Sequence, residues 1–292
     1  MSSPLPPVAP RQRTLLSDAT RSFSRNRLAM VGLVVVGIFI LCALLANLIA
    51  PAPYYRTNLS ETLKFPGLHH LLGTDAVGRD LLSRIIYGVR SSLIVAFSVQ
   101  VIAFLIGVTL GSLAGLRGGW VDFVVLRIVE IMQALPGFLF TMFIMSVLGN
   151  GLFNVILAIG FTSWIDVCRL TRGQIIALRE REFVVAAHSY GTSPRRIILR
   201  HLLPHALPPL IIMLALGIPN AIFAEAGLSF LGIGLNDPLP SLGKMVGDGL
   251  AYMSAYWYMG VVPTLTIALA MLSFNFVGDG LRDALDPTMY NQ

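Results

Sequence analysis

Residues Arg179 to Pro209 read REREFVVAAHSYGTSPRRIILRHLLPHALPP, a polar and basic stretch enclosed by hydrophobic runs on both sides. Four residues of its first half recur at helical spacing: Phe183, Val184, Ala187 and Tyr190. A short helix is therefore predicted over Glu180 to Tyr190. Gly191 can end this helix in a left-handed conformation, and Ser193 with Pro194 can begin the next as N-cap and first helical residue. The stretch predicts two short helices joined by a tight corner.

The second of these helices has an apolar face of four residues: Ile197, Ile198, Leu202 and Leu203. Three prolines then mark the return into the next hydrophobic run: Pro204, Pro208 and Pro209. Ala186 and Ala187 leave room for the close approach of another surface. Such a basic helix–turn–helix between two membrane spans favours docking of a cytoplasmic partner. An ordinary basic loop on the cytoplasmic face is the alternative interpretation.

The composition indicates the class of protein. Hydrophobic residues make up 55% of the 292 residues and charged residues 12%, whereas soluble proteins carry about 25% charged residues. Several apolar runs reach the roughly 20 residues that a helix needs to cross a bilayer. We therefore predict an all-α membrane protein. The net charge of +6 fits anionic lipid and membrane topology, and no aromatic-interleaved basic patch indicates nucleic-acid binding.

Six transmembrane helices are predicted. Their approximate limits are residues 29–50, 91–116, 121–148, 152–168, 206–230 and 258–277, with Pro136 and Gly137 inside the third. Residues 1–28 form a cytoplasmic N-terminal tail, and residues 51–90 an extracytoplasmic segment. Residues 91–292 form a core of five spans that contains the loop at about 179–209. With both termini in the cytoplasm, 15 of the 21 Lys and Arg residues lie on that side, as the positive-inside rule requires.

Three basic residues stay on the outer side in this arrangement: Arg79, Arg84 and Arg90. They lie within or just after Gly78 to Val89, whose leucines and isoleucines share one helical face. This pattern is typical of an amphipathic helix at the outer membrane interface.

The loop also resembles a known family motif. Val185-Ala186-Ala187, three residues, Gly191, nine residues, His201 and then Leu203-Pro204 is similar to the EAA loop of binding-protein-dependent ABC importer permeases. That loop reads Glu-Ala-Ala, three residues, Gly, nine residues, Ile, one residue, Leu-Pro. The spacing matches throughout, while Val185 replaces the Glu and His201 replaces the Ile.

Three further segments resemble dipeptide and oligopeptide permeases: LGTDAVGRD at residues 72–80, AEAGLSFLG at 224–232 and GDGLRDALDP at 278–287. With four motifs in order, the chain is similar to the C-type permease subunit of a peptide importer. The resemblance implies a type I ABC importer permease fold, with six transmembrane helices and a cytoplasmic coupling helix. It also implies residence in the cytoplasmic (inner) membrane.

The family implies a five-part machine that contains a second, unlike permease subunit, two ATP-binding subunits and an extracytoplasmic substrate-binding protein. This chain would then be non-catalytic and hold no cofactor or metal, because ATP is bound by the partner subunits. By the motif match, the residues that couple to the ATPase are Glu182, Phe183, Val185, Ala186, Ala187, Tyr190, Gly191, Pro194, Leu203 and Pro204.

Polar and ionisable residues in the spans are candidates for the pathway or its gates. They are Glu130, Gln133, Asp166, Asn220 and Glu225, together with Gln100 and Asn275. Glu130 can instead pair with Arg127, three residues away on the same helical face, and Asp166 can pair with Arg169. Glu225 has no local cation, and its motif favours a role in an outer gate.

The segment before the second span is expected to contact the binding protein. Asp75, Arg79 and Asp80 are the candidate contact residues, and they can also form local ion pairs that order the loop. His69 and His70 raise the question of a metal, but adjacent residues do not share a helical face and no ligand stands at metal spacing. A surface pair of histidines is the favoured interpretation.

Two other function classes are open to such a chain. An enzyme is disfavoured because no G-x-S-x-G, H-E-x-x-H or phosphate-binding loop occurs. A secondary transporter or channel is disfavoured because no repeat relates the two halves. The resemblance favours a peptide substrate, but glutathione and nickel complexes are handled by other members of the family.

Overall fold

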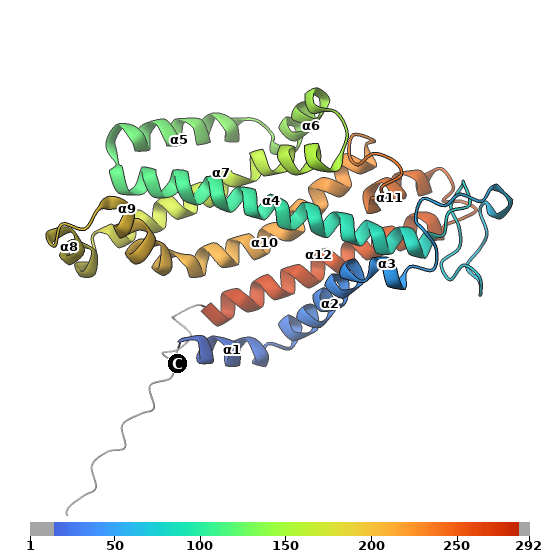
Figure 1. The fold of residues 1–292 in the computed structure, drawn as a ribbon, viewed down its shortest axis with the longest axis horizontal. Helices are drawn as coiled ribbons and strands as arrows, with labels where there is room; N and C mark the ends of the chain where they lie inside the picture. The colour runs from blue at the N-terminus through green and yellow to red at the C-terminus, as the bar shows by residue number, and fades with distance from the viewer. Residues whose placement is uncertain (1–14, 286–292) are drawn as a thin grey trace, which may run out of the picture.

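The structure, a computed structural model, describes residues 15–285, and its regular elements are helices (Figure 1). In chain order they are α1 (Leu15–Arg25), α2 (Arg27–Leu44), α3 (Ala46–Ile49), the 3₁₀ turn η1 (Leu59–Glu61), α4 (Leu81–Arg117), α5 (Gly119–Ala134), α6 (Gly137–Leu148), α7 (Leu152–Arg179), α8 (Glu182–Ser189), α9 (Pro194–Ile197), the π-helical segment η2 (Ile198–Leu202), α10 (Leu203–Phe230), α11 (Leu242–Leu250) and α12 (Tyr258–Leu285). No strand occurs within residues 15–285, so the all-α prediction is confirmed.

Five helical stretches are long and apolar enough to cross a membrane: α2, α4, α7, α9 to α10, and α12. The bent pair of α5 and α6 makes a sixth if it counts as one span. The third predicted span is therefore broken, with a bend of 90° between its two helices. Pro136 explains the break, because it lacks an N–H donor and restricts Leu135 before it to extended backbone, where ψ is 134°.

The second span differs from the prediction at its beginning. The helix expected over Gly78 to Val89 is no separate element, because α4 starts at Leu81 and continues without a break to Arg117. Several side chains of its first turns are buried, Arg84 among them. Arg84 can be buried there because Asp75 of the preceding loop pairs with its guanidinium group.

The predicted ends of other spans also move. α7 continues to Arg179 instead of ending near residue 168, and α12 continues to Leu285 instead of 277. α10 begins at Leu203, so Pro204 lies in its first turn instead of before the span, and Pro208, Pro209, Pro219 and Pro263 lie inside helices. Prolines are tolerated within membrane helices because neighbouring groups satisfy the freed carbonyls.

The centre of the bundle is the contact between α4 and α7, the most extensive helix pair among the described residues. Gly107 and Gly115 of α4 let the two backbones approach each other. A Cβ atom at Gly107 would lie 2.6 Å from Val167 Cβ, and one at Gly115 would lie 2.9 Å from Ile175 Cβ. With Gly111 between them these glycines stand at four-residue spacing, and small residues in such a row commonly allow close helix packing in membranes.

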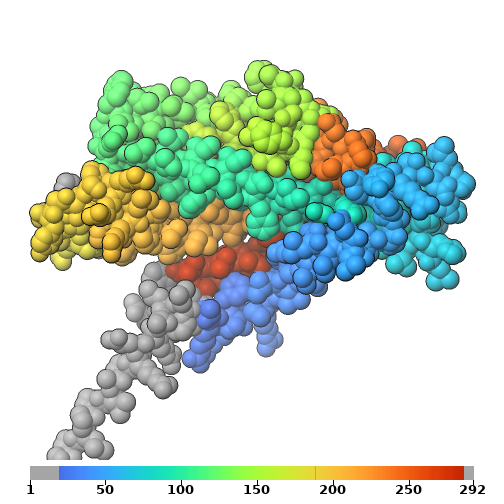
Figure 2. Space-filling model, viewed as in Figure 1, coloured from blue at the N-terminus to red at the C-terminus, as the bar shows by residue number. Residues whose placement is uncertain are grey.

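The long helices run along the longest axis of the molecule, and each end carries its own group of short elements (Figure 1). One end holds α8 and α9, and we call it the α8 end. The other end holds α11 and the segment of residues 51–80, and we call it the α11 end. The space-filling view shows these two groups as the opposite tips of the molecule (Figure 2).

Candidate functional site

The predicted coupling loop folds as a hairpin of α8 and α9 at the α8 end. Four buried apolar residues fix it to the bundle: Ile175, Val184, Ile197 and Leu202. They come from α7, α8, α9 and η2, and Leu116 at the end of α4 packs against them. The hairpin is therefore not a free loop, because its inner face belongs to a small apolar core of its own.

The corner between the two helices has the geometry that the sequence predicts. Gly191 has a φ of 72°, in the left-handed region where glycine is favoured. The Thr192 N–H donates to the Ala187 carbonyl at 3.2 Å, the long hydrogen bond of a Schellman motif. Ser193 is the N-cap of α9 and Pro194 its first residue, although the Ser193 hydroxyl makes no capping hydrogen bond.

The outer face of the hairpin exposes apolar and aromatic side chains. Val185 is 54% exposed and Tyr190 is 89% exposed, and Ala186 beside them is also exposed. Ala187 is instead buried, so only one of the two small residues faces outward. Phe183 stacks on His205 of α10, with ring centroids 4.8 Å apart.

Basic residues border this exposed patch. Four arginines of the hairpin are exposed: Arg181, Arg195, Arg196 and Arg200. An exposed apolar patch with a polar rim is the usual appearance of a protein interaction site. We call the exposed residues Val185, Ala186 and Tyr190, together with these arginines, the hairpin surface.

Two arginines of α7 connect the base of the hairpin to the bundle. Arg179 Nη1 donates to the Gly115 carbonyl of α4 at 3.1 Å. Arg172 makes a bidentate ion pair with Asp122 of α5, in which Nη2 and Oδ2 are 2.6 Å apart. Arg179 therefore holds the end of α7 next to the hairpin against α4, and Arg172 holds α7 against α5.

Several of the predicted pathway residues line one cavity of about 780 Å³. Its polar lining comes from four helices and consists of Gln100, Ser163, Asp166, Arg169, Asn220 and Arg282. Asp166 also lines a smaller cavity of about 180 Å³ together with Gln133. Asp166 is exposed and has no ion pair among the described residues, whereas Arg169 donates to Gln133 Oε1 at 2.7 Å. The alternative pairing of Asp166 with Arg169 is therefore wrong.

Glu130 lies apart from these cavities. It forms an exposed ion pair with Arg127 at 2.8 Å, as the alternative interpretation expected. Three residues of the larger cavity were not among the candidates predicted from the sequence: Ser163, Arg169 and Arg282. A basic residue near the end of a span gave no signal for a cavity, since the positive-inside pattern already explains it.

Glu225 of α10 is fully buried and accepts three hydrogen bonds from serine hydroxyls. Ser92 of α4 donates to Oε2 at 2.8 Å. Ser229 of α10 and Ser241, the N-cap of α11, donate to Oε1 at 2.9 and 2.8 Å. A single carboxyl group thus connects α4, α10 and α11 near the α11 end.

The segment before α4 is organised around Asp75. Arg79 Nε donates to Asp75 Oδ2 at 2.6 Å, and Arg84 pairs with the same oxygen. Burial opposes ionisation of the Asp75 carboxyl, but the backbone N–H of Arg79 and the two guanidinium groups outweigh burial and lower its pKa. The expected local ion pair of Asp75 with Arg79 is present, and the Asp75 side chain is turned into the segment.

His70 connects two other carboxylates of this segment. Its Nδ1 lies 2.9 Å from Asp80 Oδ1, and its Nε2 lies 3.3 Å from Glu61 Oε2. The hydrogen bond with Asp80 raises the pKa of His70. Asp80 also accepts from the Ser83 N–H at 2.8 Å and caps α4. In residues 15–285 no group of three or more His, Cys, Asp or Glu side chains is arranged to hold a metal ion.

Comparison with known families places most of the chain in one group of membrane proteins. Residues 107–290 match the model described as "Binding-protein-dependent transport system inner membrane component". Residues 14–66 match the model described as "N-terminal TM domain of oligopeptide transport permease C". The first match includes the hairpin, Glu225 and the residues that line the cavity of about 780 Å³ except Gln100.

Two relatives match over nearly their whole length. The chain is 39% identical over 282 residues to the oligopeptide transport system permease protein OppC of Bacillus subtilis, covering 97% of this chain and 92% of the relative. It is 42% identical over 272 residues to the dipeptide transport system permease protein DppC of Alkalihalophilus pseudofirmus, covering 93% and 90%.

The fold has a solved counterpart as well. A chain of the MetNI methionine ABC transporter, in inward-facing form, superimposes with a TM-score of 0.56 at 20% identity, covering 70% of this chain and 96% of that one. The fold is therefore that of type I ABC importer permeases. Together with the family match and the apolar helices, this shows that the chain belongs to the family of binding-protein-dependent transport system inner membrane components.

Proposed function

We propose that this chain is one of two unlike permease subunits in an ATP-driven importer of dipeptides or oligopeptides. The names of the relatives support the peptide substrate. The observation that carries the assignment is the hairpin surface, an exposed apolar patch with a basic rim on a hairpin fixed to α4 and α7. In this proposal the hairpin docks on an ATP-binding subunit in the cytoplasm. ATP is bound by that subunit, and this chain is not catalytic.

The cavity lined by Asp166 is proposed as part of the translocation pathway. It combines an exposed carboxylate, two guanidinium groups and the amides of Gln100 and Asn220. Every peptide carries an ammonium group, a carboxylate and amide groups. A cavity lined by both charges and by amides can bind these common groups without selecting one peptide sequence. Strong selection would be left to a separate binding protein.

Glu225 is proposed to act at an outer gate through its neighbours. Because its carboxyl group joins α4, α10 and the start of α11, these elements would move together at the α11 end when the bundle switches between two states. The exposed parts of residues 51–80 would meet the substrate-binding protein. Asp75 and Asp80 are buried and would order this surface from within. Arg79 is only half-buried, with its Nη1 3.9 Å from Asp237 Oδ1, and is the candidate that could meet the binding protein directly.

A reconstitution experiment tests the assignment. The chain is placed in liposomes with the second permease, the ATP-binding subunits and the binding protein, and uptake of a labelled dipeptide is followed. We expect uptake only when ATP and all partners are present. Uptake by this chain alone without ATP would favour a secondary transporter, and ATP hydrolysis by the purified chain alone would contradict its non-catalytic role.

A matched pair of variants tests the pathway in the same liposomes. Asp166→Asn removes the unpaired carboxylate of the cavity, and Glu130→Gln removes an exposed carboxylate outside it. We expect Asp166→Asn alone to slow uptake while ATP hydrolysis stimulated by the binding protein is retained. Equal uptake by the two variants would count against a pathway at Asp166.

A further inference from the structure

Arg90 differs from the other two arginines near the start of α4. Arg79 and Arg84 both bind Asp75. For Arg90, no carboxylate of the described residues lies within 4.0 Å. Its Nη1 donates instead to the neutral Asn47 Oδ1 of α3 at 3.3 Å. The Tyr87 hydroxyl donates to the same oxygen at 2.8 Å. Arg90 therefore keeps a positive charge that the protein around it does not neutralise.

The position of Arg90 along α4 fixes its depth in a membrane. Residues 91–116, which follow it, contain no charged side chain. Arg90 thus stands at one boundary of the apolar span, where the hydrocarbon meets the lipid headgroups, and Tyr87 one turn away suits the same level. A cation at this depth is stabilised by an anionic group of the lipid layer.

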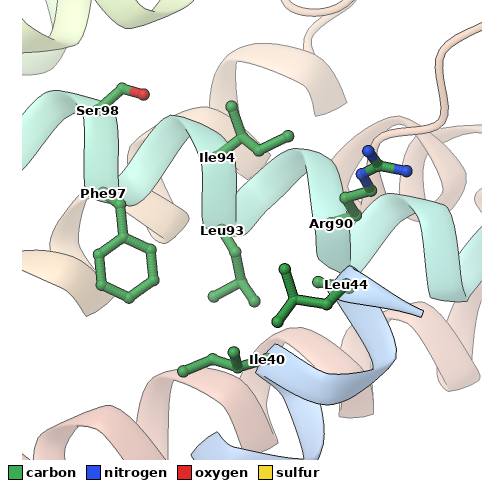
Figure 3. A pocket seen from close by; sticks show the side chains of 8 residues that line it. Ile40, Leu44, Arg90, Leu93, Ile94, Phe97 and Ser98 are labelled. Atoms are coloured by element: carbon green, nitrogen blue, oxygen red, sulfur yellow. The ribbon is translucent and has the colours of Figure 1, made fainter. Parts of the chain in front are cut away.

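An apolar groove begins at Arg90 and runs between α2 and α4 (Figure 3). Its volume is about 430 Å³. Arg90, Leu93 and Phe97 form one row along α4 by their spacing of three and four residues. Figure 3 shows Leu93 pointing toward Ile40 and Leu44 of α2, with Phe97 on the same side of α4. Seven residues separate the ends of this row, which is about 10 Å along the helix axis.

We propose that this groove binds an anionic phospholipid. The phosphodiester oxygens accept hydrogen bonds from the Arg90 guanidinium, and one acyl chain lies along Leu93 and Phe97 against α2. The local charge selects the headgroup: phosphatidylglycerol would neutralise Arg90, whereas phosphatidylethanolamine adds its own ammonium group. The bound lipid would fill the groove and so contact both α2 and α4. This inference rests on the membrane location of the chain and not on its substrate.

The test uses the assembled transporter, stripped of lipid in detergent and titrated with phosphatidylglycerol or phosphatidylethanolamine while bound lipid is counted by native mass spectrometry. We expect phosphatidylglycerol to be retained more tightly. Arg90→Gln should weaken its binding by about tenfold to a hundredfold, as expected for loss of charge-assisted hydrogen bonds. Arg56→Gln, which removes an exposed cation at the same end, should leave binding unchanged.

A second variant keeps the charge and changes the groove. Leu44 is largely exposed, so Leu44→Trp should be tolerated by the fold, and it should reduce lipid binding with Arg90 intact. Equal retention of phosphatidylglycerol by the wild type, Arg90→Gln and Leu44→Trp would overturn the proposal. Ile94 also lines the groove. If Ile94→Cys formed a disulfide with a cysteine of the second permease and no lipid were retained, the groove would be a protein interface and the proposal would be overturned.

Discussion

Among single residues, Glu225 has the most specific surroundings, since serines from three elements all donate to its carboxyl group. Glu225→Ala removes the shared acceptor and leaves these buried hydroxyls without it. A buried hydrogen-bonding group that loses its partner costs about 1–3 kcal/mol. We therefore expect the variant to lower the free energy of unfolding by about 3 kcal/mol or more, measured as a lower melting temperature of the purified transporter.

Two companion variants show whether the hydrogen bonds are responsible. Glu225→Gln keeps the shape of the side chain and one acceptor oxygen, so its loss should be smaller. Glu130→Ala removes an acidic residue from an exposed ion pair, which is worth at most about 1 kcal/mol. If Glu225→Ala were no more destabilising than Glu130→Ala, the connecting role of the carboxyl group would be refuted.

His70 gives a pH-dependent prediction for the segment at the α11 end. Its folded-state pKa is raised above 6.5, chiefly by the Asp80 carboxylate. The stabilisation is therefore complete below pH 6.5 and is lost as the pH rises through the raised value. The neighbouring Glu61, with its pKa lowered to about 2, stays ionised throughout this window.

We expect hydrogen exchange in residues 59–80 to be slower at pH 6 than at pH 9, beyond the intrinsic effect of pH. His70→Gln should remove this difference. His69→Gln changes an exposed neighbouring histidine and should preserve it. A pH difference that survives in His70→Gln would assign the effect to another group.

At the scale of elements, the corner of the α8–α9 hairpin is the sharpest test of coupling. Gly191 is left-handed, and an added Cβ atom would meet nothing within 4 Å. A substitution therefore acts through backbone conformation and not through a clash. We expect Gly191→Val to reduce ATP-dependent uptake strongly, because β-branched residues disfavour this region, which costs about 1–2 kcal/mol or more.

Gly191→Asn provides the matched control, since asparagine tolerates the left-handed conformation. It should retain most of the uptake, and both variants should reach the membrane in normal amounts. If Gly191→Asn were as inactive as Gly191→Val, the role of the glycine would be close contact with the partner and not the shape of the corner.

Local sequence signals predict individual elements well where the cause is local. Gly191 and the Ser193-Pro194 pair correctly predict the hairpin corner, and Pro136 explains the break in the third span. The continuous start of α4 could not be predicted in this way. Its buried Arg84 pairs with Asp75 of the preceding loop, and the sequence does not reveal this tertiary contact.

At the scale of the whole molecule, the cavity shows the same limit. The sequence selects Asp166 and Asn220 as polar residues in spans, but their meeting depends on how the helices pack. The close approach of α4 and α7 at Gly107 and Gly115 sets that packing. Composition therefore predicts which residues are unusual in a membrane, and the fold determines which of them share a cavity.

The two ends of the molecule are joined by the same long helices. α4 and α7 contact the hairpin core at the α8 end, and α4 also contacts Glu225 near the α11 end. A movement imposed on the hairpin would therefore reach the other end through continuous helices. This arrangement fits the proposed coupling of an ATP-binding subunit at the hairpin to a gate at the α11 end.

The most direct measurement is a site-specific crosslink from the hairpin surface in the assembled, transport-active complex. Val185→Cys, in a background without Cys42 and Cys168, should crosslink to an ATP-binding subunit. Phe153→Cys, an exposed position at the α11 end, should not. If Val185→Cys gave no such crosslink and instead reacted with a membrane-impermeant maleimide added from outside, the docking role of the hairpin would be contradicted.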